Sequence, residues 1–213
     1  MKYGESLFDI LYLLFAVISG CRLLYRAEDR SVKIMGWAAL VLGLGDAFHL
    51  LPRVLAYFVP GDFGFYLGTG KLVTSITVTI FYVLLYYIWL YRYHKEKNQR
   101  LHLTVWFLAA VRIIICMFPQ NGWTGEGGNM VWAVLRNIPF IFLGACICRL
   151  YYNERKTDRH LRHVWLYIFF SFLFYLPVAL GAGILPALGM LMLPKTICYI
   201  LLILAFWNSN LEQ

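Results

Sequence analysis

The sequence contains little charge. Charged residues make up 14% of its 213 positions, whereas 61% are apolar. A typical soluble domain carries about 25% charged residues and about 45–50% apolar ones. The short segments between the apolar runs leave no room for a soluble domain. This composition indicates one transmembrane domain over residues 1–213, in a multi-pass protein of the cell membrane whose first partner is the lipid bilayer.

Acidic residues are scarcer still. The chain has 11 Asp and Glu against 19 Lys and Arg, which gives a formal net charge of +8. An excess of that kind can indicate nucleic-acid binding. In a multi-pass membrane protein it is more simply explained by the Lys and Arg that gather in cytoplasmic loops. We therefore expect no nucleic-acid partner.

Cysteines are few and follow no pattern. All five lie in apolar runs, without the spacing of metal ligands and without a partner in an exterior loop: Cys21, Cys116, Cys146, Cys148 and Cys198. Cysteines in such surroundings are usually small packing residues. The sequence therefore predicts no disulfide, no metal site and no bound cofactor.

Long apolar runs are what the sequence has in abundance. A membrane-spanning helix needs about 20 mostly apolar residues. The last run, 164–207, is about twice that length and must form two helices, with a break marked by Gly181, Gly183, Pro186 and Gly189. The predicted fold is all-α with seven transmembrane helices, at 6–25, 34–59, 72–93, 103–118, 131–152 and two within 164–207.

Basic residues alternate between the loops. The loops after the first, third and fifth spans each carry three or four Lys or Arg. The segment 119–130 carries none, and the segment between the second and third spans carries only Lys71. Cytoplasmic loops hold the excess of Lys and Arg in most membrane proteins. The pattern therefore predicts an N-terminus outside the cell and a C-terminus in the cytoplasm.

Two parts of the chain resemble each other. The segment 15–25 reads FAVISGCRLLY and 142–152 reads FLGACICRLYY, while 79–85 reads TIFYVLL and 196–202 reads TICYILL. The matches predict a parallel repeat, with residues 6–93 and 131–207 as its halves and the helix at 103–118 as linker. Chance similarity between apolar helices is the alternative. This three-plus-one-plus-three plan resembles the SWEET and PQ-loop transporters and, more distantly, the rhodopsins.

Several charged side chains lie inside the predicted spans. Asp46 is near the middle of the second span, where an ionised carboxylate costs at least about 2.5 to 3.5 kcal/mol. Asp46, His49 and Arg53 are spaced i, i+3 and i+7, so a helix places them on one face. The other candidates fall in the outer parts of later spans: Arg112, Arg136, Asn137 and Lys195.

These polar residues predict a water-filled cavity that opens outward. Its ligand would be an anionic or zwitterionic small molecule or a lipid headgroup, because Arg and Lys recognise carboxylates and phosphates. The alternative is that Arg53, Arg112 and Arg136 extend to the headgroups at nearby helix ends. Asp46 could also form a structural ion pair with Lys195. Pro139, Pro177 and Pro194 interrupt three spans, as helices at transporter binding sites often are.

Three functions follow from this reading. The first is a small transporter or permease. The second is a membrane enzyme acting on a lipid-like substrate with Asp46 and His49 as acid and base. The Gly45-Asp46 pair resembles the lysoplasmalogenase family, which implies a further late aspartate, but the run 164–207 has no Asp or Glu. The third is a seven-helix receptor with Lys195 as a retinal attachment point. A homo-oligomer is left open.

Overall fold

The structure is a computed structural model that describes residues 2–124, 129–181 and 185–211. Every regular element within these ranges is helical. Gly183, one of the residues expected to mark the last break, lies outside them. The elements are α1 (Lys2–Tyr25), α2 (Arg30–Phe58), α3 (Gly64–Arg92), α4 (Gln99–Met117), η1 (Pro119–Asn121), α5 (Met130–Asn153), α6 (Val164–Gly181), η2 (Pro186–Leu191) and α7 (Met192–Leu211).

Seven segments of the described chain are long and apolar enough to cross a membrane, in agreement with the predicted number. They coincide with α1 to α6 and with Ala187–Ser209, which joins η2 to α7. The all-helical prediction is confirmed, and the chain has the character of a multi-pass membrane protein. The boundary that differs most is the start of α3, at Gly64 rather than near residue 72, so Lys71 lies within a helix and not in a loop.

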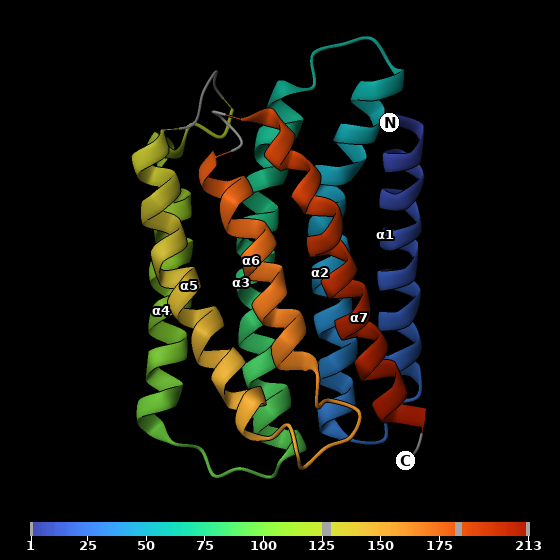
Figure 1. Ribbon diagram of the computed structural model, residues 1–213, viewed down its shortest axis with the longest axis vertical. Coiled ribbons are helices and arrows are strands. Elements are labelled where there is room, and N and C mark those ends of the chain that lie inside the picture. Colours follow the sequence, from blue (N-terminus) through green and yellow to red (C-terminus); the bar gives the residue numbers. More distant parts are fainter. Residues whose placement is uncertain (1, 125–128, 182–184, 212–213) are drawn as a thin grey trace.

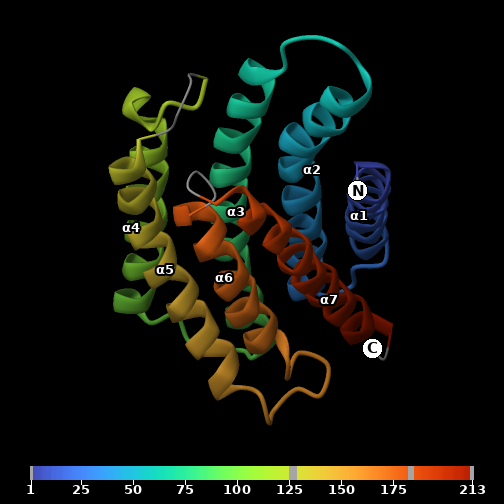
Figure 2. The same cartoon turned by 45° about the horizontal axis from the view of Figure 1, so that its top comes forward.

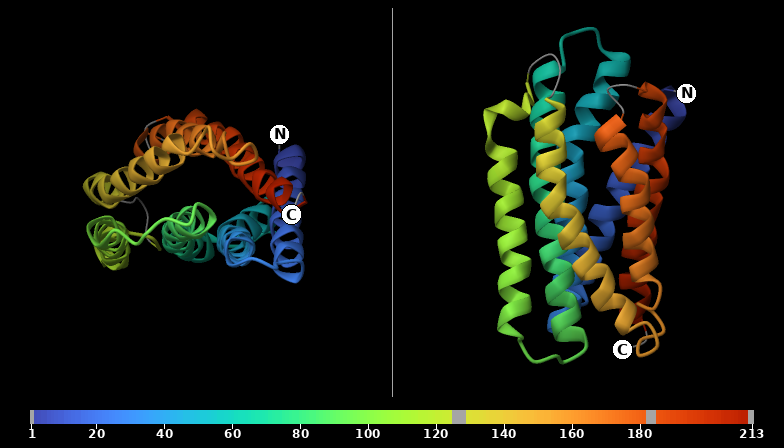
Figure 3. Two further views of the ribbon diagram at one scale, coloured as in Figure 1. Left: turned by 90° about the horizontal axis from the view of Figure 1, so that it is seen from below. Right: turned by 60° about the vertical axis from the view of Figure 1, so that its left-hand side comes forward.

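The helices form two rows (Figure 1). Seen along the bundle in Figure 3, α1, α2, α3 and α4 follow one another in one row, and α5, α6 and α7 lie opposite them. Each helix packs against its neighbour in sequence, and α1 also contacts α7, which closes the bundle at one side. Figure 2 shows α6 and α7 lying across α3 and α2. The predicted repeat is not tested by this arrangement and stays a prediction.

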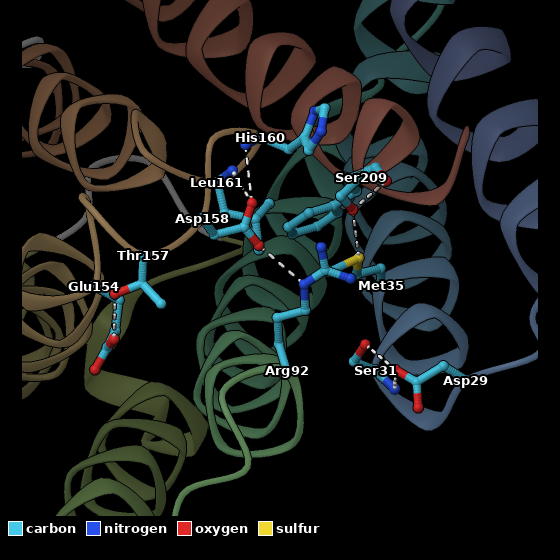
Figure 4. Close-up of polar contacts among 11 residues, drawn as sticks. Asp29, Ser31, Met35, Arg92, Glu154, Thr157, Asp158, His160, Leu161 and Ser209 are labelled. Carbon is cyan, nitrogen blue, oxygen red and sulfur yellow. Dashed lines mark hydrogen bonds and ion pairs between the residues drawn. The ribbon is translucent and has the colours of Figure 1, made fainter. Parts of the chain in front are cut away.

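The basic loops share one end of the bundle, which we call the basic end. It holds the segments 26–29, 93–98 and 154–163 at the bottom of Figure 1, opposite the N-terminus. Asp158 ties the last of these segments to the end of α3, because it accepts hydrogen bonds from Arg92 Nε at 2.9 Å and from the backbone N–H of His160 at 2.9 Å (Figure 4). Lys95 pairs with Glu154 at 2.8 Å and so joins two of the segments. Asp158 and Glu154 are therefore both matched to basic side chains.

Asp29 caps the start of α2. Its carboxylate accepts a hydrogen bond from the backbone N–H of Arg30 at 2.7 Å. It also accepts from the backbone N–H of Ser31 at 3.2 Å and from the Ser31 hydroxyl (Figure 4). The Ser31 hydroxyl, followed by the backbone N–H groups, lowers the pKa of Asp29. A lowered pKa means that the cap stabilises the fold above the unfolded value of 3.8 and loses this effect as the pH falls further.

We therefore expect Asp29→Ala to lower the free energy of unfolding by about 1 kcal/mol at neutral pH. The difference from the unmutated protein should shrink as the pH falls below about 4, because the protonated carboxyl is a poorer acceptor. Thermal unfolding in detergent across this pH range measures it. Asp29→Asn is the control, since it keeps an acceptor that does not titrate. A difference that stays constant with pH would contradict the assignment.

Glycines let α2 and α3 approach each other closely. A Cβ atom on Gly70 would collide with the Phe48 carbonyl and lie 2.7 Å from the His49 Cα atom, both backbone atoms of α2. A Cβ on Gly68 would collide with the Trp123 carbonyl. Glycine is a weak helix former, and this stretch precedes the apolar run from which the third span was predicted. The close contact with α2 accommodates it as helix, so that α3 includes Lys71.

Gly70→Ala should destabilise the protein by about 2 kcal/mol, since backbone atoms cannot move aside as a flexible side chain can. For a chain of this size that corresponds to a fall of about 4 to 8 °C in the unfolding temperature. Gly4→Ala is the matched control, because nothing lies within 4 Å of its Cβ position. Equal unfolding temperatures for the two variants would show that α2 and α3 do not pack this closely.

Candidate functional site

A pocket of about 280 Å³ lies among α2 to α7. Its walls come from the parts of these helices far from the basic end and from Trp123 in the segment before α5. Five of its lining residues are basic, and none of the described lining residues is acidic: His49, Lys71, Arg112, Arg136 and Lys195. We call it the cationic pocket. It brings together four of the seven residues predicted from the sequence.

Aromatic and hydroxyl side chains complete the wall. Phe140, Tyr175 and Tyr199 are among them. The Ser75 hydroxyl donates a hydrogen bond to the Lys71 carbonyl at 2.8 Å, and the Thr74 hydroxyl donates one to the Gly45 carbonyl at 3.0 Å. These hydroxyl protons are thus already used within the protein. Recognition of a ligand's charge falls on the basic side chains.

Arg112 is the most deeply buried charge of the pocket. Its side chain is 1% exposed, and its guanidinium carbon lies 3.2 Å from the centroid of the Phe140 ring. Nε and Nη1 have no hydrogen-bond partner among the described residues. The nearby Cys116 thiol also interacts with the guanidinium, but a thiol is a weak hydrogen-bond acceptor. Arg112 does not extend to a helix end, so the headgroup alternative is wrong for this residue. A buried guanidinium with unpaired N–H groups is costly unless an acceptor binds it, and an anion would be the strongest acceptor.

Arg136 is held in place by the segment that follows α4. Its Nη1 donates a hydrogen bond to Asn121 Oδ1 at 2.9 Å, and its guanidinium carbon lies 4.5 Å from the centroid of the Trp123 ring. Asn121 in turn donates to the carbonyls of Ile115 at 2.7 Å and Phe118 at 2.9 Å. One of five guanidinium N–H groups is used in this way. The others can reach a ligand from a fixed position.

Lys195 enters the pocket from the start of α7. Its Nζ lies 4.9 Å from the centroid of the Tyr199 ring and 5.4 Å from that of Tyr175. The Tyr175 hydroxyl donates to Asn137 Oδ1 at 2.9 Å, and Asn137 donates to the Ala133 carbonyl at 2.8 Å. Asn137, predicted as a binding residue, therefore lies behind the wall and orients Tyr175. The two rings surround the ammonium without neutralising it.

Asp46 faces α1 rather than the cationic pocket. Its Oδ2 accepts a hydrogen bond from the Tyr12 hydroxyl at 2.7 Å. Asp46 is within electrostatic range of Lys195, but the ion pairs of the described residues do not include this one. The direct ion pair that the sequence left open as an alternative is therefore not formed. Asp46 weakens the field of Lys195 without occupying its hydrogen-bonding positions.

Arg53 and His49 are separated as well. Arg53 forms an ion pair with Glu5 of α1, and its Nε donates to the Tyr57 hydroxyl at 3.4 Å. It lines a different pocket. His49 lines the cationic pocket, and its buried Nδ1 has no hydrogen-bond partner within the described residues. The three residues predicted to share one face therefore have different surroundings. His49 lines the cationic pocket, Arg53 lines a different pocket, and Asp46 makes a buried contact with Tyr12.

Lys71 is the charged lining residue that sequence reasoning missed. Its spacing from Thr74, Ser75 and Val78 is i, i+3, i+4 and i+7, which is one face of a helix. All four line the pocket. This polar stripe was the signal, and it was hidden because the third span was expected to begin after Lys71. Trp123 gave no comparable signal, because its position depends on how the chain turns after α4.

A larger cavity, between α5 and α6, is of a different kind. It encloses about 680 Å³, and its lining is mostly apolar, with Arg149 as its charged member. Several of its residues are exposed on the outside of the bundle, such as Ile141 and Phe169. An exposed apolar groove of this kind is compatible with contact to the hydrocarbon chains of lipids. It offers no set of polar groups that converge on a ligand, so the smaller cationic pocket is the candidate site.

Comparison with known proteins adds no relative to this description. No family model, curated protein or solved structure matches the chain. The function is therefore inferred from the cationic pocket.

Proposed function

We propose that this protein is a small membrane transporter that binds an anionic solute in the cationic pocket. The observation that carries the proposal is the buried guanidinium of Arg112, whose Nε and Nη1 have no hydrogen-bond partner among the described residues and which lies among other basic side chains. A pocket with four permanent cations and no described acidic lining residue requires a negative ligand to neutralise it. Arg offers paired planar donors for carboxylate or phosphate, and Lys a point charge.

The position of the pocket supports transport. Under the positive-inside rule the basic end faces the cytoplasm of the cell, so the pocket opens toward the exterior. Its basic residues come from both predicted repeat halves and from the linker between them: His49 and Lys71, Arg136 and Lys195, and Arg112. Transporters built from repeats bind their substrates where the halves meet. The proposed repeat and the pocket are therefore consistent with one another.

Prolines adjoin the pocket. Pro139 precedes the lining residue Phe140 inside α5, and Pro177 precedes Val178 inside α6. A proline within a helix removes a backbone hydrogen bond and favours bending there. Pro194 differs from expectation, because α7 begins at Met192 and the proline sits in its first turn, where N–H groups have no intrahelical partner anyway. Bending at α5 and α6 would open or close the wall of the pocket.

The enzyme alternative has less support. Asp46 is bonded to Tyr12 and His49 Nδ1 has no partner, so the two side chains do not form an acid–base pair. The receptor alternative depends on Lys195, whose ammonium also fits an anion site. Addition of retinal to the purified protein separates this case, since a coloured adduct would favour the receptor.

Flux through proteoliposomes tests the proposal. Purified protein is reconstituted, and uptake of labelled succinate, citrate and inorganic phosphate is measured under imposed gradients. We expect uptake of at least one of these anions, and its loss in Arg112→Gln. Arg100→Gln is the control, because it removes the same charge from an exposed side chain at the basic end. Uptake equal to that of empty vesicles for every anion would refute the transporter assignment.

A further inference from the structure

A second pocket lies between α1, α2 and α7. It encloses about 250 Å³, and its charged lining residues are Glu5 and Asp9 of α1 and Arg53 of α2. Two carboxylates therefore face one guanidinium, so the pocket carries an excess of one negative charge when both are ionised. We call it the acidic pocket. Met192 lines both this pocket and the cationic pocket, so the two are neighbours on either side of one side chain.

Only one of the two carboxylates is neutralised. Glu5 forms the ion pair with Arg53 and accepts a hydrogen bond from the Tyr57 hydroxyl at 3.1 Å. Asp9 is 5% exposed, and its Oδ2 has no hydrogen-bond partner among the described residues. An ionised carboxylate in such surroundings is costly unless it acquires a positive partner or a proton. Asp9 thus has no positive partner of its own among the described residues.

The charged groups around Asp9 do not neutralise its carboxylate. On its own helix the neighbour is Glu5, and from α2 the groups within electrostatic range are Arg53 and Asp46. The lining residues from α7 are uncharged, and the Thr196 hydroxyl donates to the Met192 carbonyl at 3.0 Å rather than to Asp9. Arg53 is shared with Glu5. Asp9 therefore faces two further carboxylates and one guanidinium that is already paired.

We propose that Asp9 is a proton-binding site. The carboxylate takes one proton from water in the acidic pocket and becomes a neutral carboxylic acid, and it returns that proton to water when it ionises again. A metal ion fits less well, because hard cations such as Ca²⁺ require about six or more oxygen ligands and Arg53 repels them. If the proposed anion transport is correct, this proton is the coupled ion, taken up beside the anion across Met192.

Infrared spectroscopy of the full-length protein, titrated from alkaline to acidic pH without added solute, tests the site directly. We expect a carbonyl band of a protonated, buried carboxyl group that disappears in Asp9→Asn. Asp46→Asn removes the other buried carboxyl of this region and should keep the Asp9 band. Asp9→Glu should shift the band, which preserves the test if Asp9→Asn does not fold.

Two results would overturn the proposal. The first is a spectrum that neither Asp9 variant changes. The second concerns sodium: choline is replaced by sodium ions at constant pH, and the intensity of the carbonyl band is compared with its change on titration. A change as large as that caused by protons would make Asp9 a sodium site. Because no anion is needed for this titration, a failure of anion binding elsewhere in the bundle leaves its outcome unaffected.

Discussion

Replacement of Arg112 by methionine is expected to weaken anion binding strongly and, at the same time, to stabilise the protein without ligand. The two effects have one cause. Arg112 is buried, its Nε and Nη1 lack partners among the described residues, and the pocket around it contains further positive charge. The unliganded protein is therefore destabilised by this side chain, whereas an anion would gain charge-assisted hydrogen bonds from it.

The expected magnitudes are large. Two charge-assisted hydrogen bonds at about 1.5 kcal/mol each correspond to a loss of about 100-fold in affinity. Replacement of a poorly compensated buried charge by an apolar side chain of similar length should raise the free energy of unfolding by about 1 to 3 kcal/mol. Calorimetry with the transported anion and thermal unfolding in detergent without it measure the two effects on the same preparations.

Arg136→Met and Arg100→Met make this result specific. Arg136 is bonded to Asn121 and packed on Trp123, so its removal should weaken binding but lower stability. Arg100 is exposed at the basic end, and its removal should leave affinity unchanged. If Arg112→Met is less stable than the unmutated protein and binds anions equally well, Arg112 has a structural role and the pocket is not an anion site.

Arg112 and Arg136 show which features of the site the sequence could predict and which it could not. Both lie within about two turns of a helix end, where a long side chain can extend to headgroups. Composition and periodicity identified them as charges inside apolar helices. They could not show that Phe140 covers one guanidinium or that Asn121 binds the other, since both contacts depend on packing between helices distant in sequence.

The prediction that Asp46, His49 and Arg53 share one helix face was too coarse to show which neighbouring helix each side chain would contact. With about 100° of rotation per residue, Asp46 and Arg53 point within about 20° of each other and His49 points about 40° to 60° away from them. That difference directs Asp46 and Arg53 toward α1, where Tyr12 and Glu5 bind them, and His49 toward the cationic pocket. Glu5 was not predicted as a partner of Arg53 because it precedes the first apolar run.

The number of spans was easier to predict than the site. Length and hydropathy of each run depend on the run alone, so seven helices follow without knowledge of their neighbours. The pocket depends on which helices pack together. The close contact of Gly70 with the backbone of α2 extends α3 and brings Lys71 into the wall, a consequence that helix propensity opposes.

The valence of the ligand should dominate its affinity. Four permanent cations converge on a pocket of about 280 Å³, while Asp46 lies behind Lys195 and is occupied by Tyr12. A second negative charge placed about 6 Å from one of these cations gains about 3 kcal/mol at an effective dielectric constant of about 20. We therefore expect dianions to bind about 100-fold more tightly than monoanions of the same shape.

Matched pairs of anions measure this selectivity: succinate against succinamate, and methyl phosphate against dimethyl phosphate. The pair whose shape fits the pocket should show the full ratio, and Lys195→Gln should reduce it to about tenfold because one of the converging charges is lost. Tyr175→Phe is the companion control, since it removes the hydroxyl bonded to Asn137 but leaves every charge in place. Equal affinities for both members of each pair would mean that the basic side chains do not act together, and that the cationic pocket recognises shape rather than charge.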